Sequence, residues 1–255
     1  MENPHLAANR VDVARVIAAQ TWDWLGNQIG ATTSVPRPSA RRQRMQELAE
    51  PLRAILQTTI VMNNSTLRAS ILAAVCDPDH RSRTLLLGVT EASAHMPAAE
   101  LEELGITAIA NLCEQSLIAE LQMPERDSSD WSIVGFESSD GCKDCTQLAD
   151  FLADSGRKQF VWPLAKPRRQ HIHQWIDLAE LPLTHVTKRE GSPHKLVITK
   201  TRELFDREAR HRSMLQASLE SVQQLISSGA SSTPARPRPA SPTPHHLGLV
   251  SRPFG

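Results

Sequence analysis

The chain has 255 residues, 40% of them apolar, with 28 basic and 28 acidic side chains that leave no net charge, and only four cysteines. A chain of this length buries roughly 70% of its unfolded surface without disulfide bonds, so one or two globular domains in a reducing compartment are expected. No apolar run approaches the ~18 residues that span a bilayer, and the N-terminus lacks the apolar stretch of a secretion signal, so we expect a cytoplasmic protein outside the membrane.

The first half of the sequence has the periodicity of helices. Apolar residues, among them Val13 and Trp24, recur at helical spacing near the N-terminus, and the same pattern returns further along the chain. Residues 30–40 contain Val-Pro-Arg-Pro-Ser, which is typical of a linker. We predict an N-terminal helix within 1–29, a linker over 30–40 and stacked antiparallel helices over 41–125.

Residues 131–226 are predicted to form a small α+β module, because strand patterns and helical patterns alternate there. The expected elements are a strand at 131–136, a helix beginning near Cys142, a strand at 159–164, a helix at 166–178, a β-hairpin at 184–200 and a helix at 204–226. Glu190-Gly-Ser-Pro marks the hairpin turn. Six prolines among few apolar residues predict a disordered tail over 227–255. The predicted fold class is α+β and mostly helical.

The hairpin is expected to pair with the strand at 159–164, because a two-stranded hairpin alone is marginal in water. Leu196 and Ile198 share one face of its second strand and Val197 lies opposite, so both faces are expected to be at least partly covered. The final helix is expected to cover one face through apolar side chains, namely Leu204, Phe205, Met214 or Leu215.

The zero net charge conceals an uneven distribution. Residues 91–156 carry 2 basic and 14 acidic side chains, whereas residues 157–212 carry 13 basic and 6 acidic ones. Either the two segments pack on each other or present differently charged solvated faces, or the basic segment binds an anionic partner. Nucleic acid is one such partner, with Trp162 or Trp175 available to stack on bases. The basic residues that would contact it are Lys166, Arg168, Arg169, Lys188, Arg189 and Lys195.

Cys142 and Cys145 form a Cys-x-x-Cys pair at the predicted start of a helix. Two cysteines at this spacing can bind one tetrahedral Zn²⁺, with Zn–S near ~2.3 Å, but a structural site needs two further ligands. The sequence has no second Cys-x-x-Cys, so the missing ligands are sought among four histidines: His171, His173, His185 and His194. His171 and His173 lie about 200° apart on a helix, so at most one of them can face the ion, together with a hairpin histidine.

Thiol–disulfide exchange is the rival chemistry for this pair, because a cysteine that follows a strand at a helix N-terminus is typical of redox sites. Asp140 and Asp144 disfavour it, since nearby carboxylates raise the pKa of a thiol and attract a cation instead. Two ordinary buried cysteines are a third interpretation. Cys76 and Cys113 lie on apolar helical faces and are interpreted as core residues.

A resemblance to a known group of proteins is carried by three stretches: Gly141-Cys-Lys-Asp-Cys, Arg168-Arg-Gln-His-Ile-His-Gln and Thr184-His-Val-Thr-Lys-Arg-Glu-Gly-Ser-Pro-His. Residues 131–212 resemble the cysteine- and histidine-containing C-terminal module of uncharacterised bacterial and fungal proteins whose N-terminal part is similar to 2-oxoglutarate/Fe(II) oxygenases. That module has a further cysteine where this sequence has Asp140, so one ligand of a zinc site is replaced.

The oxygenase part of those proteins does not carry over to this sequence. Its iron site requires His-x-Asp/Glu and a distant histidine, and none of the ten histidines is followed two residues later by a carboxylate. We expect no dioxygenase activity. The leading hypothesis is a non-catalytic binding or scaffolding protein with a metal-stabilised C-terminal module and a protein partner or anionic ligand. The alternatives are a thiol–disulfide or metal-dependent enzyme centred on Cys142 and Cys145, and a nucleic-acid-binding module.

Overall fold

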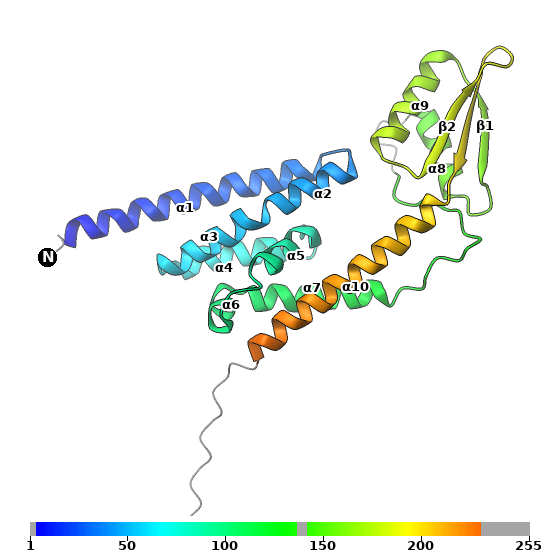
Figure 1. Cartoon of the computed structure of the whole chain (residues 1–255). Coiled ribbons are helices and arrows are strands. Elements are labelled where there is room, and N and C mark those ends of the chain that lie inside the picture. Colours follow the sequence, from blue (N-terminus) through cyan, green and yellow to red (C-terminus); the bar gives the residue numbers. More distant parts are fainter. Residues whose placement is uncertain (1–3, 137–141, 231–255) are drawn as a thin grey trace, which may run out of the picture.

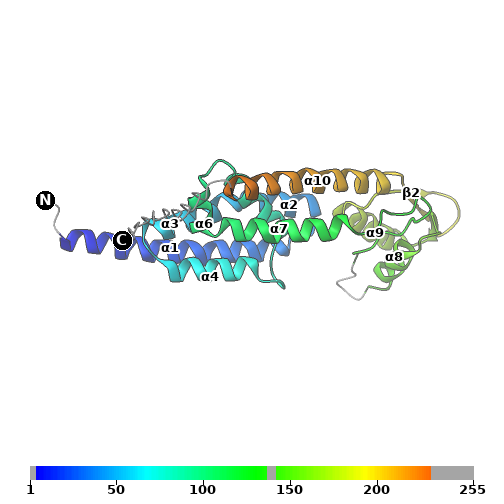
Figure 2. The same cartoon turned by 90° about the horizontal axis from the view of Figure 1, so that it is seen from below.

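The computed structural model describes residues 4–136 and 142–230 (Figure 1). In this part of the chain the elements are α1 (Pro4–Thr33), α2 (Pro38–Glu47), α3 (Ala49–Val61), α4 (Ser65–Cys76), α5 (Arg83–Ala92), α6 (Ala98–Leu104), α7 (Ile106–Leu121), α8 (Lys143–Ala153), β1 (Gln159–Pro163), α9 (Lys166–Leu178), β2 (Leu183–Lys188), β3 (Lys195–Lys200) and α10 (Glu203–Ala230). Helices α1 to α7 form an elongated bundle, and the strands with α8 and α9 form a smaller module at one end of it (Figures 1 and 2). The predicted fold class is confirmed.

An apolar core holds the bundle together, and each of its helices contributes to that core. Leu25 of α1 and Ile109 of α7, for example, are completely buried. Two helices begin at residues whose side chains accept a backbone N–H three residues further on, Asn64 before α4 and Ser82 before α5. Gly105 separates α6 from α7 with φ of +79°, a left-handed conformation that glycine adopts without steric cost.

The predicted linker over 30–40 is wrong in its bounds. Helix α1 continues to Thr33 and α2 begins at Pro38, so the connection comprises only 34–37. Pro38 occupies the first helical position, where its missing N–H costs nothing and its fixed φ favours a helix start. The prolines that indicated a linker therefore mark a short turn between two helices.

Helix α1 presents a second apolar stripe that the bundle does not cover. Ala18 and Leu25 are buried against the bundle, whereas Val13, Ile17 and Trp24 are 59%, 56% and 50% exposed. The periodicity that correctly predicted this helix therefore comes largely from its exposed side.

The sheet of the module is antiparallel, with strand order β1-β3-β2. Ile198 of the central strand β3 pairs with Phe160 of β1 on one side and with His185 of β2 on the other. The hairpin and its pairing with the preceding strand are therefore confirmed. The first hairpin strand, β2, lies at an edge of the sheet.

One face of the sheet packs against α8 and α9. The core between them consists of apolar side chains from α8, β1, α9 and β3: Leu148, Phe151, Leu152, Phe160, Trp162, Ile172, Ile176, Leu196 and Ile198. On the opposite face Val197 is buried, but Val161 and Val186 beside it are 48% and 54% exposed. The expectation that both faces are at least partly covered is therefore confirmed for the central strand, and the opposite face is more open at the two edge strands.

Residues 131–136 do not form the predicted strand. Their backbone bonds to the end of α8 instead, since the N–H of Trp131 donates to the carbonyl of Ser155 at 2.9 Å and the N–H of Ile133 to that of Leu152 at 2.7 Å. Ile133 is buried in the core of the module, which accounts for the strand-like apolar pattern. The segment is an irregular connection that docks on α8.

Helix α10 belongs to both parts of the molecule. It leaves the module at its first turn and lies along α7 of the bundle (Figures 1 and 2). Of the four residues predicted to cover the sheet, Leu204 and Phe205 do pack on the module's core. The prediction is wrong for the other two, because Leu215 packs in the bundle core and Met214 is 51% exposed.

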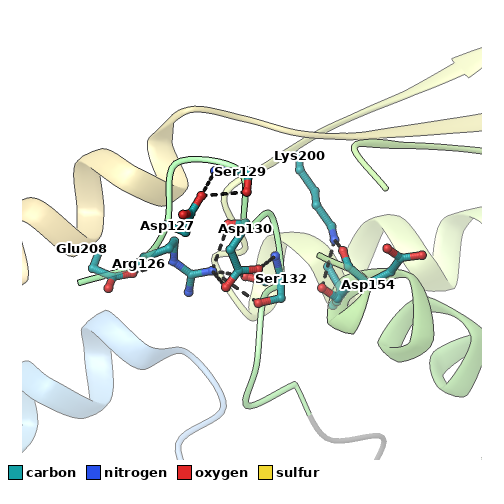
Figure 3. Close-up of polar contacts among 9 residues, drawn as sticks. Arg126, Asp127, Ser129, Asp130, Ser132, Asp154, Lys200 and Glu208 are labelled. Atoms are coloured by element: carbon teal, nitrogen blue, oxygen red, sulfur yellow. Dashed lines mark hydrogen bonds and ion pairs between the residues drawn. The ribbon is translucent and has the colours of Figure 1, made fainter. Parts of the chain in front are cut away.

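Lys200, the last residue of β3, is buried beneath the C-terminal end of α8. Its ammonium group donates to the carbonyls of Leu152 at 3.0 Å and Asp154 at 2.6 Å, at a helix end where carbonyls lack intrahelical partners (Figure 3). Nζ also lies 4.7 Å from the centre of the Phe151 ring. Burial lowers the pKa of Lys200 to about 8.

Arg126 anchors the segment that leads from the bundle to the module. Its Nε donates to Glu208 of α10 at 2.7 Å, and its Nη1 donates to the carbonyl of Ser132 at 2.6 Å and contacts Asp130 at 3.4 Å (Figure 3). The Arg126 side chain is only 17% exposed, so solvent screens these contacts weakly. The connection is thereby tied to the first half of α10.

We predict that Lys200 makes the stability of the protein rise with pH above about 8. The folded-state pKa near 8 lies below the ordinary value of 10.5, so between the two values the unfolded chain binds more protons than the folded one. The free energy of unfolding should therefore increase over this interval, by at most about 1.4 kcal/mol per pH unit. Urea unfolding of wild-type and Lys200→Met protein at a series of pH values measures the effect. Equal pH slopes in the two proteins would contradict it.

Candidate metal centre

Cys142 and Cys145 lie at the N-terminal end of α8. Cys142 is the N-cap residue with extended backbone angles, and the helix begins at Lys143. This local geometry places residues three apart on the same side of the first turn. Cys142 is half-buried, and Cys145 is only 1% exposed.

Helix α9 lies beside α8 and brings His171 to the two cysteines. Cys145 Sγ is 3.1 Å from His171 Nε2, and the two sulfurs and the ring nitrogen all lie within 4.8 Å of one another. Around a tetrahedral ion with bonds of about 2.0–2.3 Å, donor atoms lie about 3.3–3.8 Å apart, so these three can share one ion once the side chains adjust by up to about 1 Å. Within residues 4–136 and 142–230, Cys142, Cys145 and His171 are the only group of three or more such donors this close together.

Asp144, between the two cysteines, is engaged with α9. Arg168 Nε donates to Asp144 Oδ2 at 2.8 Å, and a second guanidinium nitrogen bonds to the other carboxylate oxygen. This pair holds the pKa of the Asp144 carboxyl below its usual range. Because Arg168 compensates the carboxylate, Asp144 opposes a thiolate less than the sequence suggested. The pair ties the first turn of α8 to the first turn of α9.

The other histidines proposed as ligands make different contacts. His173 Nδ1 is 2.5 Å from His185 Nδ1, which links α9 to β2. His194 Nδ1 bonds to the carbonyl of Gly191 at 3.1 Å, within the hairpin turn. The expected hairpin ligand is therefore not part of the cluster in the described structure. The hairpin contacts the side of α9 that carries His173, about 200° around the helix from His171.

Two residues that contact the His173–His185 pair, Asp177 and Thr187, were not predicted from the sequence. His185 Nε2 is 3.1 Å from Asp177 Oδ1, and His173 Nε2 is 3.2 Å from Thr187 Oγ1. The signal was their spacing, since Asp177 follows His173 by one helical turn and Thr187 follows His185 by two strand positions. The pKa of His173 is lowered mainly by burial of its imidazole and further by the neighbouring His185.

The six basic residues proposed to contact nucleic acid do not all face solvent freely. Arg169 is buried, and its guanidinium donates to the carbonyls of Leu164 and His194. Arg168 is paired with Asp144. The remaining four are exposed or half-buried: Lys166, Lys188, Arg189 and Lys195.

The uneven charge along the chain is compensated by contacts within it. Among the described residues, three pairs join an acidic residue of segment 91–156 to a basic residue of segment 157–212: Glu120–His211, Glu125–Arg212 and Asp144–Arg168. Of the two interpretations of the charge pattern, these contacts agree with packing of the segments on each other. Trp162, proposed to stack on bases, is only 6% exposed and lies in the module's core.

Comparison with known proteins does not extend this description. The chain matches no protein-family model, no curated protein and no solved structure. In the part of the chain that the structure describes, no helix has both the length and the apolar character needed to cross a membrane. The Cys142, Cys145 and His171 cluster is therefore the feature on which functional inference rests.

We predict that the adjacent arginines of α9 contribute very differently to stability. Arg169→Ala leaves two carbonyls without their donor and should lower the free energy of unfolding by about 1–3 kcal/mol. Arg168→Ala removes an ion pair whose arginine is 55% exposed and therefore screened by solvent, so the loss should be smaller than in Arg169→Ala. Urea unfolding of both variants compares them directly. An equal or larger loss in Arg168→Ala would contradict the assignment.

Proposed function

We propose that the protein is a non-catalytic binding or scaffolding protein whose C-terminal module holds a Zn²⁺ ion between Cys142, Cys145 and His171. The observation that carries this proposal is the convergence of three donors from two helices within 4.8 Å. An ion at this position joins the first turn of α8 to the middle of α9. Residues 131–212 also resemble a cysteine- and histidine-containing module, but Asp140 stands where that module has a further cysteine, so the resemblance adds little to the proposal.

The donor set favours zinc over other common ions. Thiolate sulfur and imidazole nitrogen are the ligands of structural zinc sites, whereas Ca²⁺ and Mg²⁺ prefer oxygen. Cys145 is almost completely buried beside Leu148 of the module's core, so an ion bound to it is largely shielded from solvent. Because the ligands converge only in the folded chain, the free energy of binding adds to that of folding.

The binding role is supported by surfaces that the chain leaves open. The apolar stripe of α1, with Val13, Ile17 and Trp24, and the open sheet face around Val161 and Val186 are exposed. Exposed apolar patches of this kind are typical of contacts with protein partners. We propose a protein partner, or an anionic ligand at the exposed Lys188 and Arg189 of the hairpin. We place the protein in the cytoplasm, whose reducing environment keeps cysteines as thiols that can bind metal.

A metal-dependent enzyme is the alternative, and one observation favours it. Three protein donors are the ligand count of catalytic zinc sites, in which water or substrate takes the fourth position. Cys142, Cys145 and His171 supply three donors, so a fourth position of the ion is available to water or to another donor.

Zinc content tests the proposal. Elemental analysis of full-length protein, purified without chelators, is expected to give about one zinc per chain. Cys142→Ser and His171→Gln should each reduce zinc affinity at least about tenfold, because each removes one of three ligands. Cys76→Ser is the matched control, since Cys76 is also half-buried but lies in α4, outside the cluster.

Two results would contradict the proposal. One is zinc-free wild-type protein in which Cys142 and Cys145 exchange reversibly with a glutathione buffer, which would favour the thiol–disulfide enzyme. The other is equal zinc content in Cys142→Ser and Cys76→Ser, which would place the metal elsewhere.

Removal of zinc is expected to destabilise the module. An ion present at 100 times its Kd stabilises the folded state by about 2.7 kcal/mol, and a chelator abolishes this contribution. The midpoint of thermal unfolding of wild-type protein should therefore fall on addition of a chelator, as measured by circular dichroism. Cys142→Ser should show little change on the same treatment, and an unchanged midpoint in wild-type protein would argue against a stabilising ion.

A further inference from the structure

The sheet face that packs on α9 is apolar on β1 and β3, whereas on β2 it is apolar at Leu183 and polar at the two following positions of the same face. Two cross-strand rows show this change: Phe160, Ile198 and His185 in one row, and Trp162, Leu196 and Thr187 in the next. The residues on β1 and β3 are buried core residues, whereas β2 places an imidazole and a hydroxyl at the corresponding positions. Departures from the apolar pattern of a covered face are expected at functional sites.

Helix α9 meets this polar edge with two polar residues one turn apart, His173 and Asp177. His173 contacts both strand residues, with Nδ1 2.5 Å from His185 Nδ1 and Nε2 3.2 Å from Thr187 Oγ1. His185 Nε2 is 3.1 Å from Asp177 Oδ1. The four side chains, two from each element, form one continuous chain of contacts.

The positions of the protons follow from Asp177, because a carboxylate only accepts hydrogen bonds. His185 therefore donates through Nε2, and its Nδ1 presents a lone pair toward His173. In the neutral pair His173 carries its proton on Nδ1, and its Nε2 accepts from the Thr187 hydroxyl. One proton thus lies where the lone-pair positions of two imidazoles converge.

We propose that this position is a second metal site, in which His173 and His185 bind one divalent transition-metal ion through Nδ1 in place of that proton. No proton is lost, because the His173 proton moves from Nδ1 to Nε2, from which it donates to Thr187 Oγ1, and the oxidation state of the ion is unchanged. Imidazole nitrogen suits Zn²⁺, Ni²⁺ and Cu²⁺ and does not suit Mg²⁺ or Ca²⁺. The proposal does not depend on the zinc ion at Cys142, Cys145 and His171.

The geometry of the pair fits an ion with a small adjustment. Two nitrogens bound at about 2.0–2.1 Å to one ion lie about 2.9 Å apart in octahedral and about 3.3 Å apart in tetrahedral coordination, so the Nδ1 atoms need to separate by roughly 0.4–0.8 Å. The two rings are tilted by 46° and are not stacked, so both nitrogens can point to one position. A carboxylate on the far N–H, as Asp177 provides for His185, is the usual support of a metal-bound histidine.

The location also fits an ion that exchanges with solvent. The His185 side chain is 18% exposed and that of Asp177 is 68% exposed. The site therefore lies at the edge of the sheet, where water or a ligand group can complete the coordination of the ion.

Ni²⁺ is the probe, because it can be counted separately from zinc. Full-length protein is dialysed against zinc and then against Ni²⁺, and both metals are measured by elemental analysis. We expect one Ni²⁺ per chain with zinc retained, and at least about tenfold weaker Ni²⁺ binding in His185→Gln. His194→Gln is the matched control, because His194 lies in the same hairpin but contacts Gly191. Asp177→Ala should weaken Ni²⁺ binding about 10–100-fold.

A second measurement needs no variant. In wild-type protein, paramagnetic Ni²⁺ should broaden the NMR signals of the His173 and His185 rings before those of His194. The proposal is overturned if these rings are not broadened first, or if His185→Gln binds Ni²⁺ as well as His194→Gln does. In that case the pair is a hydrogen bond between α9 and β2. Zinc content is read separately, so a failure of this site is distinct from a failure at the cysteines.

Discussion

The position of α8 is the constraint on which the module depends. At its C-terminal end the buried ammonium of Lys200 binds two helix carbonyls. At its N-terminal end Asp144 pairs with Arg168, and Cys145 meets His171. A helix of 11 residues that is fixed at both ends can tilt little, so its apolar face is held against the sheet. The convergence of the metal donors is therefore a consequence of how α8 is held, in addition to the spacing of the cysteines.

Features encoded within a few residues were predictable from the sequence, and features that depend on the crossing of elements were not. The hairpin turn at Glu190-Gly-Ser-Pro and the helix start at the cysteine pair are of the first kind. The choice of His171 over His194 depends on how α8 and α9 meet, which no local pattern contains. Ile133 made residues 131–136 resemble a strand, because a buried apolar residue gives the same pattern whether its backbone pairs with a strand or docks on a helix.

Helix α9 connects the parts of the module because each of its sides contacts a different neighbouring element. His171 faces the cysteines of α8, His173 faces β2, and Arg169 binds carbonyls at the ends of the sheet. Successive residues of a helix lie about 100° apart, so a short polar stretch can supply all three directions. The basic composition of this helix therefore reflects several separate contacts inside the module, which explains why a reading of its charge alone suggested one continuous binding surface.

Helix α10 carries residues of two different cores, Leu204 in the module and Leu215 in the bundle. Eleven residues separate them, which corresponds to three full turns plus about 20° and to a length of about 16 Å. The helix therefore sets both the distance between the two cores and the rotation of one core relative to the other about the helix axis. One residue inserted between Leu204 and Leu215 would swing the module by about 100° around the helix axis, whereas eleven inserted residues would nearly restore its direction at twice the separation. The number of residues in this helix thus determines which way the cysteines and histidines face relative to the bundle.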